Sequence, residues 1–298
     1  MYYSIIALQS IEISGIGDLK MKKILNHTIL TCVILFVIMI IVHGFEAIVL
    51  RMDETILAEN FINKLFGIAV FAVVLRILGW KMKDIGFKKE GMLRNILLGL
   101  MIGAAAFIIA YGVELLILTS QHKSFHFGIF TTGFSLTDET VINTGIGYIL
   151  MCIFFNIINV IMEEGTFRGL FGKLVNTDHS LKTAIMFQAS LFGVWHIVTP
   201  LHNLIDGDIT VGTFIILAVG YIILAGMMGI KWGYLKEMTG SLYTGMADHF
   251  FNNCIATNLL HVVTPDGTDE MMLVRVLIAQ VISFVAVLIA WKKYNAKH

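Results

Sequence analysis

Three short polar groups interrupt long apolar stretches in the second half of the chain. The side chains with chemical potential in these groups are Glu163, Glu164, Arg168, Phe192, His196, His249 and Asn253. Ionisable side chains are costly in lipid, so they face a protein interior or a wet cavity and mark functional sites. Two carboxylates, two imidazoles, an amide and a guanidinium are together sufficient for a hydrolytic site within the membrane.

The two adjacent glutamates cannot share one role. Neighbours on an α-helix point about 100° apart, because the helix has 3.6 residues per turn. Glu164 and Arg168 have the i,i+4 spacing of an ion pair on one helix face, whereas Glu163 points elsewhere, without a local partner. A partly desolvated, unpaired carboxylate is a stronger base than one in water, as a general base acting on water requires. The alternative is that both glutamates end a helix and pair with lysines.

The two histidines also have structural alternatives. His196 lies one turn after Phe192, and the rings of Phe192 and Trp195 are expected to surround it and keep it neutral. A neutral imidazole can hold a water molecule or bind a metal. His249 and Asn253 share a helix face, so they could coordinate a metal or donate hydrogen bonds to an oxyanion. Alone, each group is equally well explained as a polar contact between helices.

The sequence leaves the question of a metal open. The candidate ligands are Glu163, His196 and His249, but no H-E-x-x-H helix and no preformed closed site is present. We therefore expect either no required cofactor or Zn²⁺. Asp248 and Asn252 are interpreted as helix–helix contacts, Glu46 and Arg76 as side chains that extend to the membrane surface, and His43 and Glu114 receive no role.

The composition indicates a membrane protein. Of the 298 residues 57% are hydrophobic and 14% are charged, whereas soluble domains carry about 25% charged residues. The formal net charge is zero, so no basic field suggests nucleic acid as a partner. The expected partners are membrane lipid and a peptide or membrane-protein substrate. Cys32, Cys152 and Cys254 have no motif spacing and are expected to be reduced core residues.

Apolar runs of about 20 residues can cross a bilayer as helices, and the chain has eight of them. They are 27–50, 62–80, 93–118, 144–165, 182–200, 211–230, 241–262 and 271–291. Alternate loops are rich in Lys and Arg, including those expected after spans four and six, with Arg168 and Lys231. By the positive-inside rule these loops and both termini are cytoplasmic. The fold class is therefore an all-α, polytopic bundle in the cell membrane.

The chain reads as a single transmembrane domain, 24–298, with a catalytic core at about 144–262. Residues 1–23 are expected to form a poorly ordered N-terminal extension, with Met1 or Met21 as the start. One conflict follows from these boundaries. Glu163 lies near the inner end of span four, but His196 lies about fifteen residues into span five, which corresponds to roughly 20 Å of helix.

The three motifs, in this order, resemble the CPBP family, also called the Abi or type II CAAX-protease family. The family pattern is E-E-x-x-x-R, F-x-x-x-H and H-x-x-x-N or H-x-x-x-D, each on a transmembrane helix. The resemblance implies an intramembrane endopeptidase, described either as metal-dependent or as glutamate-dependent. In the second description Glu163 and His196 serve the attacking water, and His249 and Asn253 serve the oxyanion. Glu164, Arg168 and Phe192 would then support the site.

Two other classes of function compete with the peptidase. Intramembrane Glu and His residues also relay protons in transporters, and a non-catalytic immunity or scaffold protein could keep the same fold. Transporters often contain internal repeats, whereas here the polar groups cluster in three spans without a repeat. All three motifs are intact, which favours the enzyme over the scaffold. The resemblance also implies bacteriocin processing or self-immunity as a setting.

Overall fold

The computed structural model describes residues 24–52, 61–131 and 143–297, so the predicted extension 1–23 lies outside the described residues. Within them, seven helical segments are long and apolar enough to cross a membrane. They are Thr28–Leu50, Phe61–Leu78, Met92–Ser120, Ile146–Val175, Leu181–Asp206, Val211–Thr239 and Met272–Asn295. The predicted all-α, polytopic helix bundle is confirmed.

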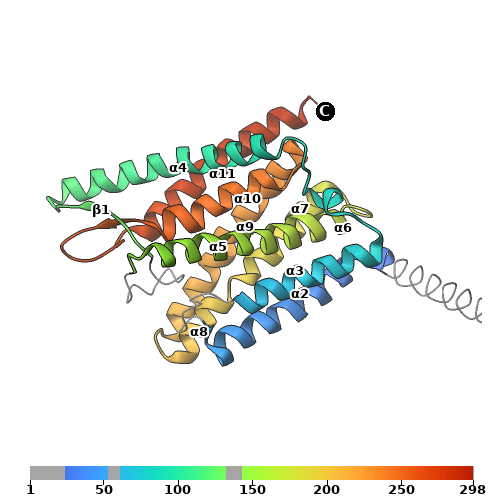
Figure 1. The fold of residues 1–298 in the computed structure, drawn as a ribbon, viewed down its shortest axis with the longest axis horizontal. Coiled ribbons are helices and arrows are strands. Elements are labelled where there is room, and N and C mark those ends of the chain that lie inside the picture. The colour runs from blue at the N-terminus through green and yellow to red at the C-terminus, as the bar shows by residue number, and fades with distance from the viewer. Residues whose placement is uncertain (1–23, 53–60, 132–142, 298) are drawn as a thin grey trace, which may run out of the picture.

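The helices form a bundle with three layers. The long ones are α2 (Thr28–Phe45), α3 (Phe61–Leu78), α4 (Met92–Ser120), α5 (Ile146–Glu163), α7 (Leu181–Trp195), α9 (Val211–Thr239) and α11 (Met272–Asn295). Helices α2 and α3 lie side by side along one side, α4 and α11 form the opposite side with the short α10 (Tyr243–Phe250), and α5 and α9 lie between (Figure 1). The shorter elements η1 (Glu46–Leu50), η3 (Met82–Ile85) and α8 (Val198–Asp206) lie near helix ends.

Span four is longer than predicted. Helix α5 continues through the π-helical segment η4 (Glu164–Phe171) into α6 (Gly172–Val175), which makes one membrane-length segment of 30 residues. The predicted end at residue 165 and the cytoplasmic loop around Arg168 are therefore wrong. Because the segment continues past Glu163, that residue lies well inside the membrane-length helix, and the predicted mismatch in depth with His196 disappears.

Span six shows the same kind of error. It was predicted to end at residue 230, with Lys231 in a loop, but α9 continues to Thr239 and Lys231 is completely buried. A hydropathy scale gives a buried, paired charge the same value as a solvated one. A span predicted from hydropathy therefore ends too early at such a residue. Helix α7 approaches α9 closely at Gly193, where a Cβ would lie 2.7 Å from the carbonyl oxygen of Ile222.

Unlike the other seven predicted spans, the predicted span 241–262 does not form a helix of membrane length. It contains the eight-residue α10, followed by the seven-residue π-helical segment η5 (Phe251–Thr257). The chain then becomes the strand β2 (Leu260–Val263), which pairs antiparallel with β1 (His126–Ile129) beyond the end of α4. The prediction of helix over 258–262 is therefore wrong, since backbone pairing with β1 takes over there.

This short segment nevertheless runs from one end of the bundle to the other. The backbone N–H of Leu242 donates to Gly86, near the start of α4, whereas β2 lies beyond the end of α4. As a result, the start of α2 and the end of α11 lie at the same end of the bundle (Figure 1). That this end faces the cytoplasm stays a prediction.

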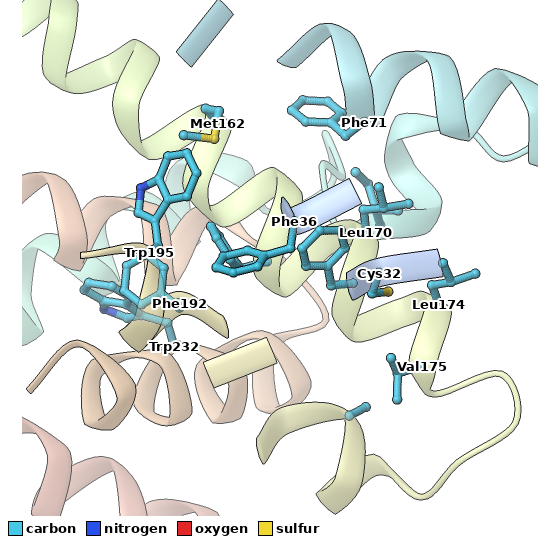
Figure 2. Packing of buried hydrophobic residues seen from close by; sticks show 14 of the residues in the cluster. Cys32, Phe36, Phe71, Met162, Leu170, Leu174, Val175, Phe192, Trp195 and Trp232 are labelled. Atoms are coloured by element: carbon cyan, nitrogen blue, oxygen red, sulfur yellow. The ribbon is translucent and has the colours of Figure 1, made fainter. Parts of the chain in front are cut away.

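The main apolar core joins the first two helices to the polar motifs. Phe192, Trp195 and Trp232 gather at one side of it, and Leu170 and Leu174 at the other (Figure 2). The rings that line the candidate site are therefore part of the core that holds the bundle together. The three cysteines are buried and free, and the sulfur atoms of Cys152 and Cys254 are 4.0 Å apart.

Candidate active site

The first and third polar groups meet around the ring of His249. Its Nδ1 lies 3.0 Å from Oε1 of Glu164, and its Nε2 lies 3.6 Å from Oε2 of Glu163. The side-chain nitrogen of Asn253 lies 3.2 Å from the same Nε2. Both glutamates and His249 are buried, whereas Asn253 is half-buried. Two carboxylates and an amide thus surround one imidazole ring, each within 3.6 Å of one of its nitrogens.

The sequence spacing correctly predicted that Glu164 pairs with Arg168. Nε of Arg168 lies 3.4 Å from Oε2 of Glu164. The guanidinium lies 3.8 Å from the centre of the Phe192 ring and 4.8 Å from that of Trp232. A cation over aromatic faces is stabilised by their electron density, and both rings also exclude water. Phe192 therefore supports the site through Arg168.

The expectation that Glu163 has no partner is wrong. Nζ of Lys64 lies 2.9 Å from Oε1 of Glu163, and both side chains are buried. The indole nitrogen of Trp195 donates to the same oxygen at 3.2 Å. The second oxygen, Oε2, is buried and accepts no hydrogen bond from the described residues. The carboxylate is therefore held by one oxygen and leaves the other open to the site.

Lys64 is the main residue that sequence reasoning missed. It belongs to α3 and is separated from Glu163 by 99 residues, so no local spacing indicates the pair. A signal was present, since Lys64 lies inside an apolar span where charges are rare and functional. Its helix is fixed at the start by the buried Glu46, whose carboxylate accepts from the backbone nitrogens of Ile62 and Asn63 at 2.7 and 2.5 Å. Glu46 therefore does not extend to the membrane surface as predicted.

His196 lies at the edge of this cluster. Its Nδ1 is 2.8 Å from the carbonyl oxygen of Phe192, which can only accept, so Nδ1 carries the proton and Nε2 a lone pair. The ring is half-buried and lies against Phe192 and Tyr221. No direct hydrogen bond joins His196 to Glu163 within the described residues.

His43 also lies beside the site, although the sequence indicated no role for it. Its buried ring stacks on that of Trp195, with centroids 4.4 Å apart. The other unassigned residue, Glu114, lies elsewhere and pairs with Arg275 at 2.8 Å. Asp248 and Asn252 make the predicted contacts between helices, with Trp232 and Gln280 respectively.

The arrangement does not fit a metal ion. Across 24–52, 61–131 and 143–297, no three His, Cys, Asp or Glu side chains converge as a ligand group. Lys64 lies 2.9 Å from Oε1 of Glu163, and Nδ1 of His249 lies 3.0 Å from Oε1 of Glu164. The predicted ligands Glu163, His196 and His249 therefore do not converge.

Comparison with known proteins supports the motif assignment. A family model described as "Type II CAAX prenyl endopeptidase Rce1-like" matches residues 145–255, which contain all three motifs. The resemblance that the motifs indicated is thereby confirmed. The match excludes α2 and α3, which carry His43 and Lys64, and it excludes α11. No curated protein and no solved structure matches the chain.

Proposed function

We propose that this chain, a member of the Rce1-like type II CAAX prenyl endopeptidase family over residues 145–255, hydrolyses peptide bonds within the membrane with a water molecule activated by Glu163. The observation that supports it is the buried Oε2 of Glu163, without a hydrogen-bond partner among the described residues, 3.6 Å from Nε2 of His249. An ionised carboxylate with one uncommitted oxygen in an enclosed site is what a general base requires.

The chemical steps follow from this geometry. The water donates one proton to Oε2 of Glu163 while its oxygen forms a bond to the carbonyl carbon of the substrate. Nε2 of His196 accepts a hydrogen bond from the other O–H group of the water, and this bond orients the water molecule. The amide nitrogen of Asn253, which lies 3.2 Å from Nε2 of His249, donates to the carbonyl oxygen of the substrate and stabilises its negative charge. Glu163 then returns its proton to the amide nitrogen as the carbon–nitrogen bond breaks.

In this mechanism Lys64 is the counter-ion of Glu163. Its ammonium group lies against the oxygen that does not face the site, so it favours the ionised carboxylate without blocking the water. Glu164 does not activate the water in this mechanism. It is bound by Arg168 and by Nδ1 of His249, and it sets the position of the imidazole.

We propose a peptide or membrane protein as the substrate, with bacteriocin processing or self-immunity as a possible setting and the cell membrane as the location. The test compares membrane proteomes of cells that carry wild type or Glu163→Ala and looks for a peptide whose processing is lost. Purified wild type in lipid nanodiscs should then cleave that peptide. If purified wild type leaves the peptide intact, the proposed activity is refuted.

The catalytic type that we propose is glutamate-dependent. Purified, active protein should keep its turnover in excess chelator, and metal analysis should find far less than one zinc per chain. One tightly held zinc, with activity lost on chelation and restored by zinc, would contradict this assignment and leave only the peptidase activity standing.

A further inference from the structure

A second buried lysine, Lys231, belongs to α9 and contacts Asp248, the residue before His249. Lys231 is completely enclosed between α9, α10 and α11. Its Nζ lies 2.6 Å from Oε1 of Gln280, 3.0 Å from the hydroxyl of Ser283 and 2.6 Å from Oδ2 of Asp248. An ammonium group has three donors and no acceptor, so every one of these partners must accept.

This constraint determines the direction of a chain of hydrogen bonds. Because Gln280 presents its oxygen to Lys231, its nitrogen donates to Oδ1 of Asn252 at 2.8 Å. Asn252 must then donate with its own nitrogen, to Oδ1 of Asn253 at 2.7 Å. Asn253 in turn presents its nitrogen to Nε2 of His249 at 3.2 Å. None of the three amides can be turned over without opposing two donors or two acceptors.

The chain ends by specifying the protonation of His249. An amide nitrogen only donates, so Nε2 of His249 must accept, and the ring proton lies on Nδ1. Nδ1 faces Oε1 of Glu164 at 3.0 Å, and the other oxygen of that carboxylate lies 3.4 Å from Nε of Arg168. The amide nitrogen of Asn253 at Nε2 and the carboxylate of Glu164 at Nδ1 thus both favour the tautomer with its proton on Nδ1, although Oε2 of Glu163 also lies 3.6 Å from Nε2.

A second arm from Lys231 fixes the plane of the same ring. Asp248 accepts from both Lys231 and the indole nitrogen of Trp232, each at 2.6 Å. The Trp232 ring stacks on His249 with centroids 4.0 Å apart and an angle of 16°. Lys231 therefore acts on the imidazole in two ways. The amide chain that ends at Asn253 contacts the edge of the ring, and Trp232 contacts its face.

We propose that Lys231 and Gln280 are positioning residues that hold His249 neutral, with its proton on Nδ1, and turn the amide nitrogen of Asn253 toward the site. Its catalytic meaning rests on the proposed function. With one N–H on His249, Asn253 keeps its second N–H for the carbonyl oxygen of the substrate. In the resting enzyme Asn253 is then the oxyanion donor, and Nε2 of His249 is a proton acceptor beside Glu163.

The experiment reads the tautomer directly. Protein labelled with ¹⁵N-histidine is reconstituted in lipid, and the His249 signals are assigned by their loss in His249→Gln. The test variant is Gln280→Met and the matched control is Ser283→Ala, since each removes one acceptor of Lys231 from α11 but only Gln280 belongs to the chain. A second test variant, Asn252→Leu, breaks the next link if Gln280→Met does not fold.

Wild type and Ser283→Ala should both show a bare Nε2 and a protonated Nδ1 near pH 7. Gln280→Met should show Nε2 protonated in addition to Nδ1, because Asn253 is then able to turn its oxygen toward the ring while Glu164 still accepts from Nδ1. A protonated Nε2 in wild type, or an unchanged bare Nε2 in both Gln280→Met and Asn252→Leu, would overturn the proposal. Its catalytic consequence is a fall in kcat of about tenfold or more, as for other outer partners of functional histidines, with KM little changed.

The two proposals fail separately. If the tautomer responds as expected but the wild type cleaves nothing, the peptidase function is wrong and the positioning of His249 stands. If the wild type cleaves the peptide but the protonation of His249 is the same in Gln280→Met and Asn252→Leu as in wild type, the positioning role is wrong and the proposed peptidase activity stands.

Discussion

At the scale of residues, the two adjacent glutamates have different surroundings. Glu163 is bound on one oxygen by Lys64 and Trp195 and faces the site with the other. Glu164 is bound by Arg168 and His249. The same substitution should therefore have different effects at the two positions.

Glu163→Gln removes the base but keeps the shape, so turnover per folded molecule should fall by about 10²–10⁴-fold. Glu164→Gln and Arg168→Gln should each lower the free energy of unfolding, by about 3–5 kcal/mol for a buried pair, and reduce activity as well. The measurements are turnover and thermal stability of all three variants. Near wild-type cleavage by Glu163→Gln would remove the assigned base and the mechanism with it.

Lys64→Met leaves Glu163 buried without a cation, and the free energy of unfolding should drop by about 3–5 kcal/mol. Adding Glu163→Gln to Lys64→Met should restore part of the stability, because no buried charge is left unpaired, but should restore no activity. Arg76→Gln, at an exposed position of the same helix, is the control and should change stability by less than about 0.5 kcal/mol. Additive effects of the two active-site substitutions would show that the pair does not interact.

At the scale of elements, sequence patterns identified the helices and the motifs that they carry. The i,i+4 pair of Glu164 and Arg168 was predictable because both partners lie on one helix face. The pair of Lys64 and Glu163 was not, since it joins helices that are distant in the chain. Hydropathy also ended two spans too early, at Arg168 and Lys231, because it counts a charge against a span even where a partner neutralises it. For Lys231 those partners, Asp248, Gln280 and Ser283, are visible only in three dimensions.

The β1–β2 end depends on Asp269, which lies outside the membrane-length helices. Burial acts to raise the pKa of Asp269, but hydrogen bonding to His261 and the charge of Arg275 outweigh it and lower the pKa below its usual value. The carboxylate therefore contributes its full stabilisation above about pH 4, the ordinary Asp value, and loses it as pH falls further.

Asp269→Asn should consequently lower thermal stability at pH 7, and its difference from wild type should shrink as the pH falls below about 4. Thermal unfolding between pH 7 and 3 measures this difference. The control is Asp266→Asn, which removes an exposed ion pair with Lys123 and should have little effect at any pH. A difference that stays constant with pH would contradict the assignment of the stabilisation to the ionised form.

At the scale of the whole molecule, the helices alternate between the two ends of the bundle. Reporter fusions at residues 85, 178 and 240 and at the C-terminus should report the cytoplasm. Fusions at 51, 125, 208 and 266 should report the outside. This follows from the loop charges and from the short segment α10–η5 joining the two ends. An external C-terminus would contradict it.

In each of two buried ion pairs, the first residue is synthesised long before its partner. Glu163 follows Lys64 by 99 residues, and Arg275 follows Glu114 by 161. At roughly 5–20 residues per second, Lys64 spends about 5–20 s and Glu114 about 8–30 s without its partner. The nascent chain must be shielded from lipid during that time. A premature stop before Arg275 would therefore release a chain in which the buried Glu114 lacks this ion-pair partner, and cellular quality control would remove that chain.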